Sequence, residues 1–306
     1  MYFMMKWNGC VSTIKYQVLL KTVELGGITK AAEALGYTQS AASRMIAALE
    51  QEWGMELLVR GRGGVYLSTA GTSLLPYLRA ACNAQKELEE QVAHLHGLTQ
   101  GTLRVGSFAS VSIHWLPPIM KIFLQRYPGI RFELVSKWEF AEVEDLIRQG
   151  QVDCGFLGLP AGEGLEVFPL RRDQFMAVLP PDHPLANAPF YPMERLAQDP
   201  FIWIPEDRDV EIGQIFQEEG IHPNLRYTVN DDFAILAMVE QGLGVSIRPE
   251  LVLQDTGRSF SAIPLERPRY RDIALSVRWG KPLSPLTARF LEVVRQWVAG
   301  NNVRSE

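Results

Sequence analysis

The sequence contains few cysteines and no long apolar run. Only three cysteines (Cys10, Cys82 and Cys154) occur in 306 residues, with no CxxC pair and no histidine spacing suited to zinc. This usage favours free thiols in a reducing cytosol, with Cys154 as buried packing. No stretch approaches the roughly 18 apolar residues that a membrane span needs. The first ten residues lack the basic start and apolar run of a signal peptide, so we expect a cytoplasmic protein, with Met4 or Met5 as an alternative start.

Residues 28–50, ITKAAEALGYTQSAASRMIAALE, contain two short helical patterns separated by Gly36-Tyr37-Thr38. Small alanines let two helices cross closely, Gly36 suits a helix end with positive φ, and Thr38 can cap the second helix. The spacing predicts a helix-turn-helix whose second helix enters the DNA major groove. A helix pair that serves only as core is the alternative. The residues expected to face DNA are Thr38, Gln39, Ser40, Ser43 and Arg44.

Two short β patterns, 57–59 and 65–67, follow and are joined by the glycine-rich segment 60–64. They predict a wing whose arginines, Arg60 and Arg62, enter the minor groove or bind phosphate. A plain hairpin turn is the alternative. Residues 1–68 carry seven Lys or Arg against five Glu. Affinity for DNA should therefore depend on a few well-placed cations and on dimerisation.

Ser68 or Thr69 is expected to cap a long helix that ends near His96. Its seam residues recur at alternating spacings of four and three, which is the pattern of a coiled coil. These residues are Leu74, Leu78, Ala81, Gln85, Leu88, Val92 and Leu95. Gln85 is the single large polar residue among these apolar seam positions, and it can fix the register of two paired helices. Self-association through this helix is expected, with a monomeric amphipathic helix as the alternative, and Gly97 and Gly101 mark a flexible joint.

From Thr102 onward strands and helices alternate, with a single helix expected over 113–126, which predicts an α/β domain with a mainly parallel sheet. Two similar sets of elements, with the chain crossing between them near 171–175 and 272–274, predict a hinged two-lobe binding domain. The expected organisation is a DNA-binding domain over 1–68, a linker helix and hinge over 69–100, and an effector domain over 101–306. Within that domain, one lobe covers about 101–171 and 274–300 and the other about 172–273.

Several segments together resemble the LysR-type transcriptional regulators in order and spacing. They are the helix-turn-helix string, VRG followed by LSTAG, and the later DCGFLGLP, AVLPPDHPLA and EQGLGVSIRPEL. The resemblance extends over nearly the whole chain from Thr13. It implies a winged helix-turn-helix, a linker helix and a two-lobe domain like type 2 periplasmic binding proteins, assembled as a dimer of dimers and controlled by a small inducer between the lobes. Residues 1–12 exceed the usual family start, and Ile28 stands where an aromatic residue is common.

Ligands of open α/β sheets bind beyond the carboxyl ends of the strands. Loop 106–112 carries Ser107 and Ser110, where a carboxylate or phosphate can sit, and the resemblance makes this loop the usual effector contact. Capping of the following helix by Ser110 or Ser112, without a ligand role, is the alternative. A second loop adds a hydroxyl, a cation and an aromatic wall, namely Ser136, Lys137 and Trp138. A solvated surface charge is the alternative for Lys137.

The second lobe contributes Trp203, which either lines the cleft or belongs to the core of the lobe, and Ser246 within GLGVS. Together with the serines and Lys137 these groups suit a small organic anion. The predicted partners are double-stranded DNA, this effector, further copies of the chain and RNA polymerase. No catalytic residue, metal or cofactor is predicted.

Two other functions use the C-terminal half alone. An enzyme is disfavoured because neither a nucleophile elbow nor a GxxxxGK[ST] phosphate loop occurs, and the acidic cluster within 142–145 has the pattern of a solvated helix face. A solute-binding transport protein is disfavoured by the predicted DNA-binding head and the missing signal peptide. The sequence therefore favours a DNA-binding regulator over both.

Overall fold

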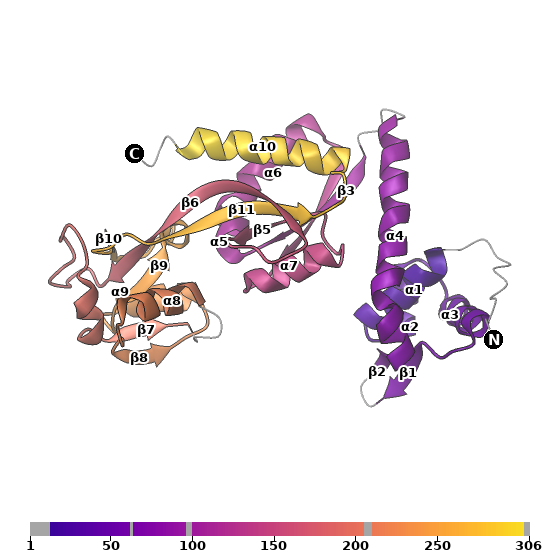
Figure 1. The fold of residues 1–306 in the computed structure, drawn as a ribbon, viewed down its shortest axis with the longest axis horizontal. Coiled ribbons are helices and arrows are strands. Elements are labelled where there is room, and N and C mark those ends of the chain that lie inside the picture. The colour runs from indigo at the N-terminus through magenta and orange to yellow at the C-terminus, as the bar shows by residue number, and fades with distance from the viewer. Residues whose placement is uncertain (1–12, 62–63, 96–99, 205–209, 303–306) are drawn as a thin grey trace. The chain divides into compact units, whose positions relative to one another are not determined.

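The structure is a computed structural model that describes residues 13–61, 64–95, 100–204 and 210–302. The chain divides into two compact units, Met1–Leu98 and Thr99–Glu306, each with its own core. Figure 1 labels the helices and strands of both units. Within the described residues, no helix is both long enough and apolar enough to cross a bilayer.

The first unit is a three-helix head with a wing and a long helix (Figure 1). Its elements are α1 (Thr13–Glu24), α2 (Ile28–Ala34), α3 (Gln39–Trp53), β1 (Leu58–Gly61), β2 (Gly64–Leu67) and α4 (Thr69–Leu95). The sequence prediction for the turn is confirmed, since Gly36 has φ +72° and the Thr38 side chain accepts a hydrogen bond from the Ala41 N–H at 3.2 Å. Leu19, Ala42 and Leu49 are among the buried residues that hold the helices together.

The start of α4 is joined to the wing by Ser68. Its hydroxyl accepts from the Gly71 N–H at 3.0 Å and donates to the Glu56 carbonyl at 2.7 Å, so it caps the helix and holds the strand end. A Cβ at Gly71 would lie 2.3 Å from the Leu57 carbonyl oxygen. Only glycine permits this close approach, which explains its place in LSTAG.

The heptad pattern of α4 divides into two parts. Leu74, Leu78 and Ala81 pack into the core of the head, whereas Leu88 and Val92 are exposed, with 59% and 46% of their surface accessible. The sequence pattern predicted one continuous seam between two chains. In this chain, the N-terminal part of that seam instead covers α1–α3.

The second unit is an α/β domain that begins with a parallel arrangement. The elements of its first lobe are β3 (Gly101–Ser107), α5 (Ala109–His114), α6 (Leu116–Arg126), β4 (Ile130–Ser136), α7 (Phe140–Arg148), β5 (Cys154–Gly158) and the late helix α10 (Pro285–Asn302). Two long strands, β6 (Leu165–Leu179) and β11 (Tyr270–Arg278), extend from this lobe into the second one (Figure 1). The elements of the second lobe are β7 (Phe201–Trp203), α8 (Val210–Glu219), β8 (Leu225–Thr228), α9 (Asp232–Glu240), β9 (Ser246–Pro249) and β10 (Ser261–Pro264), with the short 3-10 helices Met193–Ala197 and η2 (Glu250–Leu253).

The main sheet has the strand order β10-β6-β11-β5-β3-β4, and β9 also pairs with β6. Strand β3 is parallel to both β4 and β5, whereas β11 is antiparallel to β5 and β6. Strands β7 and β8 form a separate parallel pair in the second lobe. The carboxyl ends of β3 and β4 therefore lie side by side, with Ser107 opposite Ser136.

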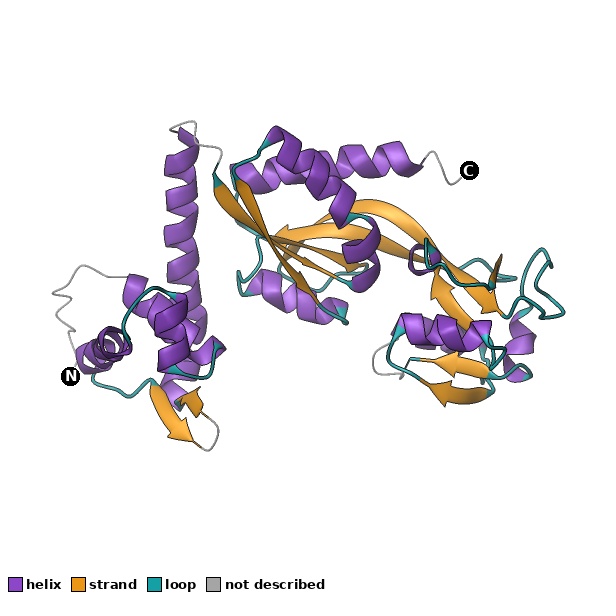
Figure 2. Ribbon diagram, turned by 180° about the vertical axis from the view of Figure 1, so that it is seen from behind, coloured by secondary structure: helices purple, strands orange, loops and turns teal. Residues whose placement is uncertain are grey.

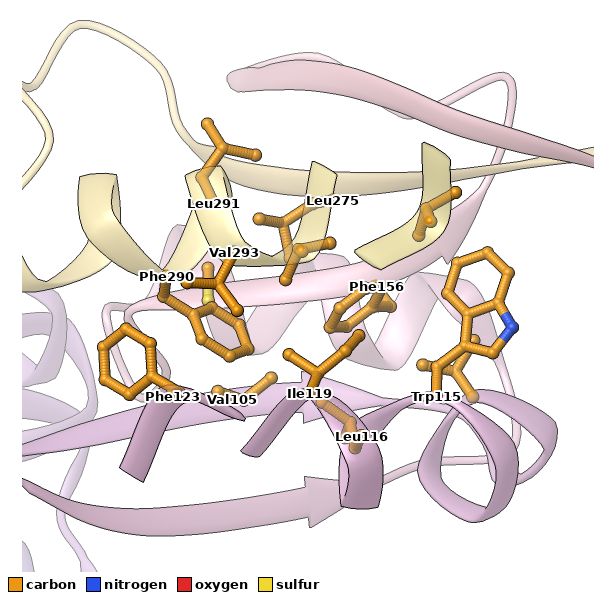
Figure 3. Close-up of a cluster of buried hydrophobic side chains, with 14 of the residues drawn as sticks. Val105, Trp115, Leu116, Ile119, Phe123, Phe156, Leu275, Phe290, Leu291 and Val293 are labelled. Carbon is orange, nitrogen blue, oxygen red and sulfur yellow. The ribbon is translucent and has the colours of Figure 1, made fainter. Parts of the chain in front are cut away.

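Helices cover both faces of the sheet in the first lobe. In Figure 2, α6 and α10 lie on one face and α7 on the other. Phe123 of α6 packs edge-on against Phe290 of α10, with ring centroids 5.6 Å apart, and both contact the cluster shown in Figure 3. A second cluster beneath α7 contains Val143, Ile147 and Leu157. The second lobe has its own clusters, but Leu251 of η2 belongs to the first-lobe cluster, so η2 packs against the first lobe.

Two elements differ from the sequence-based expectation. The helix expected over 113–126 is divided at Trp115, because Pro117 and Pro118 lack the N–H groups that would continue α5, and α6 starts anew there. The 15-residue strand β6 was not predicted as a strand. Its centre contains the charged residues Arg171, Arg172 and Asp173. These residues interrupt the alternation of apolar and polar positions by which a strand is recognised in a sequence.

Candidate DNA-reading surface and effector site

Helix α3 presents a polar face at its N-terminal end. Ala42, Ile46 and Leu49 are buried on its inner side, which fixes the rotation of the helix. The predicted DNA-facing residues Thr38, Gln39, Ser40 and Arg44 are exposed, and Ser43 is half-buried. The Gln39 amide donates to the Ser43 hydroxyl at 3.2 Å. Arg44 and Gln39 are thus the long polar side chains available on the first turns for base edges or phosphates.

The recognition helix and the wing are held together by one carboxylate. Glu50 Oε1 of α3 accepts hydrogen bonds from the backbone N–H groups of Leu57 and Leu58, at 2.8 and 3.2 Å. These are the residues that lead into β1, which pairs with β2 in antiparallel register. The predicted wing residue Arg60 lies in β1, but its side chain is outside the described residues, as is the whole of Arg62.

Three serine hydroxyls gather at the carboxyl ends of β3 and β4. Ser107 Oγ lies 2.6 Å from Ser112 Oγ, and Ser112 donates to Ser136 Oγ at 3.5 Å. Ser107 is fully buried, Ser112 is half-buried and Ser136 is exposed. The predicted residues Ser107 and Ser136 are brought together by the parallel pairing. Ser112, which the sequence predicts only as an alternative helix cap, is the residue that links the other two. Its place five residues after Ser107 in a serine-rich loop is the signal in the sequence.

The loop after β4 brings a cation with a counter-ion. Lys137 Nζ lies 3.0 Å from Glu142 Oε1, and the two side chains are 36% and 41% exposed. The hydrogen bond from Lys137 holds the pKa of Glu142 below its usual value, against a smaller opposing effect of burial. Glu142 also accepts from the Glu139 N–H in the capping box that starts α7. Trp138 is 57% exposed beside this pair.

Ser110 occupies a different position from the three clustered serines. It is buried and accepts a hydrogen bond from Arg271 Nη2 at 3.1 Å. Its hydroxyl does not cap α5, because the N-cap of that helix is Phe108. The capping alternative for Ser110 is therefore wrong, and its partner is a buried arginine on β11.

The second-lobe candidates are packed inside their lobe. Trp203 is 8% exposed and meets Phe216 edge-on at a centroid distance of 5.2 Å. Ser246 is 1% exposed and donates to the Ile202 carbonyl at 2.8 Å. The core alternative for Trp203 is thus favoured by its packing. The Trp203 indole N–H is buried and has no hydrogen-bond partner among the described residues.

No group of three or more His, Cys, Asp or Glu that could hold a metal ion occurs in the described part of the chain. Cys82 is half-buried, and burial raises the pKa of its thiol to about 11. Cys154 is fully buried, which raises the pKa of its thiol well above the usual value.

A winged helix-turn-helix head followed by a two-lobe α/β domain is the architecture of a bacterial transcriptional regulator with a ligand-responsive domain. Family comparisons agree with this class: the lysR family of bacterial regulatory helix-turn-helix proteins matches residues 15–72, and the LysR substrate binding domain matches residues 96–299. The chain belongs to the LysR family of transcriptional regulators, which are not enzymes.

Relatives of similar length support this assignment. The probable HTH-type transcriptional regulator LrrA of Synechococcus elongatus is 32% identical over 282 residues, which cover 92% of this chain and 95% of the relative. The RuBisCO operon transcriptional regulator of Allochromatium vinosum is 30% identical, with 93% and 95% covered.

Solved structures share the fold over 66% of the chain or more. Full-length OxyR C199D from Pseudomonas aeruginosa has a TM-score of 0.75 at 19% identity and covers 95% of both chains. Full-length CbnR in complex with its target DNA has a TM-score of 0.66 at 23% identity, and covers 94% of this chain and 99% of CbnR. The effector binding domain of QuiR in complex with shikimate has a TM-score of 0.58 at 19% identity, and covers 66% of this chain and 98% of QuiR.

Proposed function

We propose that α3 reads operator DNA through Gln39 and Arg44, with Thr38, Ser40 and Ser43 on adjacent phosphates and Arg60 and Arg62 at the wing. The support is the exposed polar face of α3 opposite its buried face. Side chains of this kind make the usual base-edge contacts in the major groove. The proposed organisation is a head over 1–68, a linker over 69–100 and an effector domain over 101–306, with lobes at about 101–171 plus 274–300 and at about 172–273.

The proposed effector is a small organic anion that binds at the serine cluster Ser107–Ser112–Ser136. The observation that carries this proposal is the gathering of three hydroxyls at the carboxyl ends of two parallel strands, where ligands of α/β sheets bind. Because Ser107 is buried, Ser112 and Ser136 are the hydroxyls that would contact the ligand. Trp138 offers an apolar wall. Ser110, Trp203 and Ser246 would act through positioning and core packing.

In this proposal the ligand competes with Glu142 for Lys137. The Lys137 ammonium group already has the Glu142 carboxylate at 3.0 Å. An anionic ligand must displace this carboxylate, so its net gain in binding free energy is the difference between the two interactions. Replacing Glu142 by Gln keeps the capping box, which accepts either residue, and leaves the lysine without its counter-ion. Glu142→Gln should therefore strengthen binding of anions, and Lys137→Met should weaken it.

Two measurements test the proposal. Gel retardation of DNA upstream of the gene by the purified protein tests regulation, and a thermal-shift screen tests the effector with carboxylic acids beside their neutral amides. We expect an acid, and not its amide, to stabilise the parent, to act more strongly on Glu142→Gln, and to act weakly on Ser112→Ala and Lys137→Met. Lys121→Met, an exposed lysine on α6, is the matched control. A ligand that stabilises all variants equally would place the effector site elsewhere.

The proposed assembly is a dimer of dimers in the cytoplasm, in which Leu88 and Val92 contact a second copy. Their exposure on a helix with heptad spacing supports this contact. RNA polymerase is proposed as a further partner.

A further inference from the structure

The sheet of the second unit narrows to two strands at one point, here called the waist: residues 172–174 of β6 and 270–272 of β11. On one side, β5 joins β11 from Ile273 onward; on the other, β9 joins β6 from Phe175 onward. Among the described strands, the waist residues pair only with each other. Two-stranded ribbons twist most readily, and a bulge beside Ile273 adds a local bend. The waist is therefore the part of the sheet best able to change the angle between the lobes.

A buried ion pair crosses the waist. Arg271 and Asp173 face each other in register, and Nε and Nη2 of Arg271 each lie 2.8 Å from Asp173 Oδ2. The side chains are only 7% and 1% exposed. Taking two charges out of water is costly unless their remaining donors and acceptors are also satisfied, so the other partners of this pair are informative.

Those partners come from α5 and from η2, a short helix of the second lobe that packs into the first-lobe core. Arg271 Nη2 also donates to Ser110 of α5 at 3.1 Å, and the guanidinium lies 5.1 Å from the centroid of the Phe108 ring. Asp173 Oδ1 accepts from the backbone N–H of Leu251 at 3.1 Å. Leu251 belongs to η2, which directly follows the second-lobe strand β9. One chain of polar contacts thus joins the loop after β3, the waist and η2.

We propose that Arg271 is a positioning residue that couples the effector loop to the waist. A ligand at the serine cluster shifts α5, which carries both Ser112 and Ser110, and a shift of Ser110 displaces the guanidinium from Asp173. Asp173 in turn holds η2 through Leu251. Directed polar contacts of this kind have discrete alternative partners, which suits a switch between two interlobe angles. The inference rests on the effector role proposed for loop 106–112.

The neighbouring residue pair of β6 and β11 provides a matched control. Arg172 and Asp272 are paired across β6 and β11 at 3.3 Å, but their side chains are 66% and 49% exposed. The Arg172 guanidinium lies over the exposed ring of Tyr270 at 4.9 Å. This pair has the same charges on the same two strands without the contacts to Ser110 and Leu251.

Amide hydrogen exchange of the full-length protein tests the coupling. Asp173 is joined to segment 108–114 by two routes, through Arg271 to Ser110 and through Leu251, which shares a buried cluster with Phe108 and Val111. Asp173→Asn should speed exchange at 108–114, and the Arg271→Gln background separates the two routes. We expect a rise of about tenfold at 108–114 and at 250–253, which corresponds to a coupling of ~1.4 kcal/mol. In an Arg271→Gln background, Asp173→Asn should add nothing further at 108–114. Arg172→Gln and Asp272→Asn should leave both segments unchanged.

Faster exchange confined to 250–253 in Asp173→Asn would overturn the proposal, because the pair would then act locally. If the single variants fail to fold, the uncharged double variant Asp173→Asn with Arg271→Gln carries the test, since it leaves no unpaired buried charge. Loss of protection at 108–114 with unchanged global stability supports coupling, and parent-like protection there overturns it. Failure of the parent to retard its upstream DNA would instead overturn the proposed regulation and leave the exchange result standing.

Discussion

Leu78 and Leu88 follow the same heptad pattern on α4, but Leu78 is 3% exposed within the core of the head, whereas Leu88 is 59% exposed. The two leucines therefore have different partners. Leu78 holds α4 to its own DNA-binding head, and Leu88 is available to another chain. Gln85 lies between these parts and donates to Glu89 at 2.8 Å, on the helix's own surface.

Charges placed on the exposed part of the seam should prevent dimerisation without unfolding the head. Leu88→Asp together with Val92→Asp would bury two unpaired carboxylates from each chain in a dimer, which is strongly destabilising. We expect a smaller sedimentation coefficient and loss of operator binding at concentrations where the parent binds. Ala84→Asp, on an exposed position outside the seam, is the control. A double variant that sediments like the parent would remove Leu88 and Val92 from the interface.

Leu78→Asp should have a different result. Because Leu78 belongs to the same buried cluster as Leu19 and Leu49, a carboxylate there should unfold the head itself. Far-UV circular dichroism of the isolated variant would show a loss of helix that Leu88→Asp does not cause.

Arg44→Ala should weaken operator binding by ~1–3 kcal/mol per half-site if the guanidinium contacts guanine in a bidentate manner. The folded head should be unaffected, because Arg44 is exposed. Footprinting at fixed salt, with all four base pairs tested at the contacted position, should show relaxed preference there. An unchanged footprint at the parental concentration would show that Arg44 does not read bases.

Cys82 should resist alkylation in the folded protein. With a pKa of about 11 for its thiol, raised by burial, the reactive thiolate at pH 8 is roughly a hundredfold scarcer than for a thiol at the usual 9.0. Iodoacetamide labelling followed by peptide mass mapping should modify Cys82 slowly in buffer and at an ordinary rate in guanidinium. Rapid modification in buffer would show that the thiol is more accessible than described.

His114 should make stability depend on pH. Burial lowers the pKa of its imidazole from 6.5, against a smaller opposing attraction by Asp255. The unfolded chain therefore binds a proton at a higher pH than the folded one, so the free energy of unfolding falls as the pH drops below about 6.5. Urea unfolding between pH 7.5 and 5.5 should show a smaller decrease for His114→Gln than for the parent. Equal slopes would contradict this contribution.

The elements with strong local signals were predictable from sequence. Gly36 and Thr38 identify a turn and a cap by their own backbone and hydroxyl chemistry, and both are confirmed. Parallel strands with apolar runs, such as β5, also stand out. The pairing of β3 with β4 then brings Ser107 and Ser136 together, as ligand sites at strand ends require.

The features that could not be predicted from the sequence are contacts between residues that are far apart along the chain or on different chains. Apolar residues at heptad spacing look the same whether they face their own head, as Leu78 does, or another chain. Arg271 and Asp173 lie 98 positions apart in the sequence, yet they are buried against each other. Ser110 likewise looked like a helix cap because its arginine partner lies on a strand far along the chain.

The carboxylate of Glu50 holds the start of the wing to α3 through two backbone hydrogen bonds. Gln39 and Arg44, in contrast, are exposed on the outer face of α3. In the proposed readout of DNA, rigidity and base contact are thus carried by separate side chains. If these side chains read bases as proposed, exposed residues 39 and 44 can change at little cost in folding during divergence of paralogues, and single substitutions would then alter operator preference. The same separation makes these two positions the natural sites for a randomised library in which target preference is altered while stability is kept.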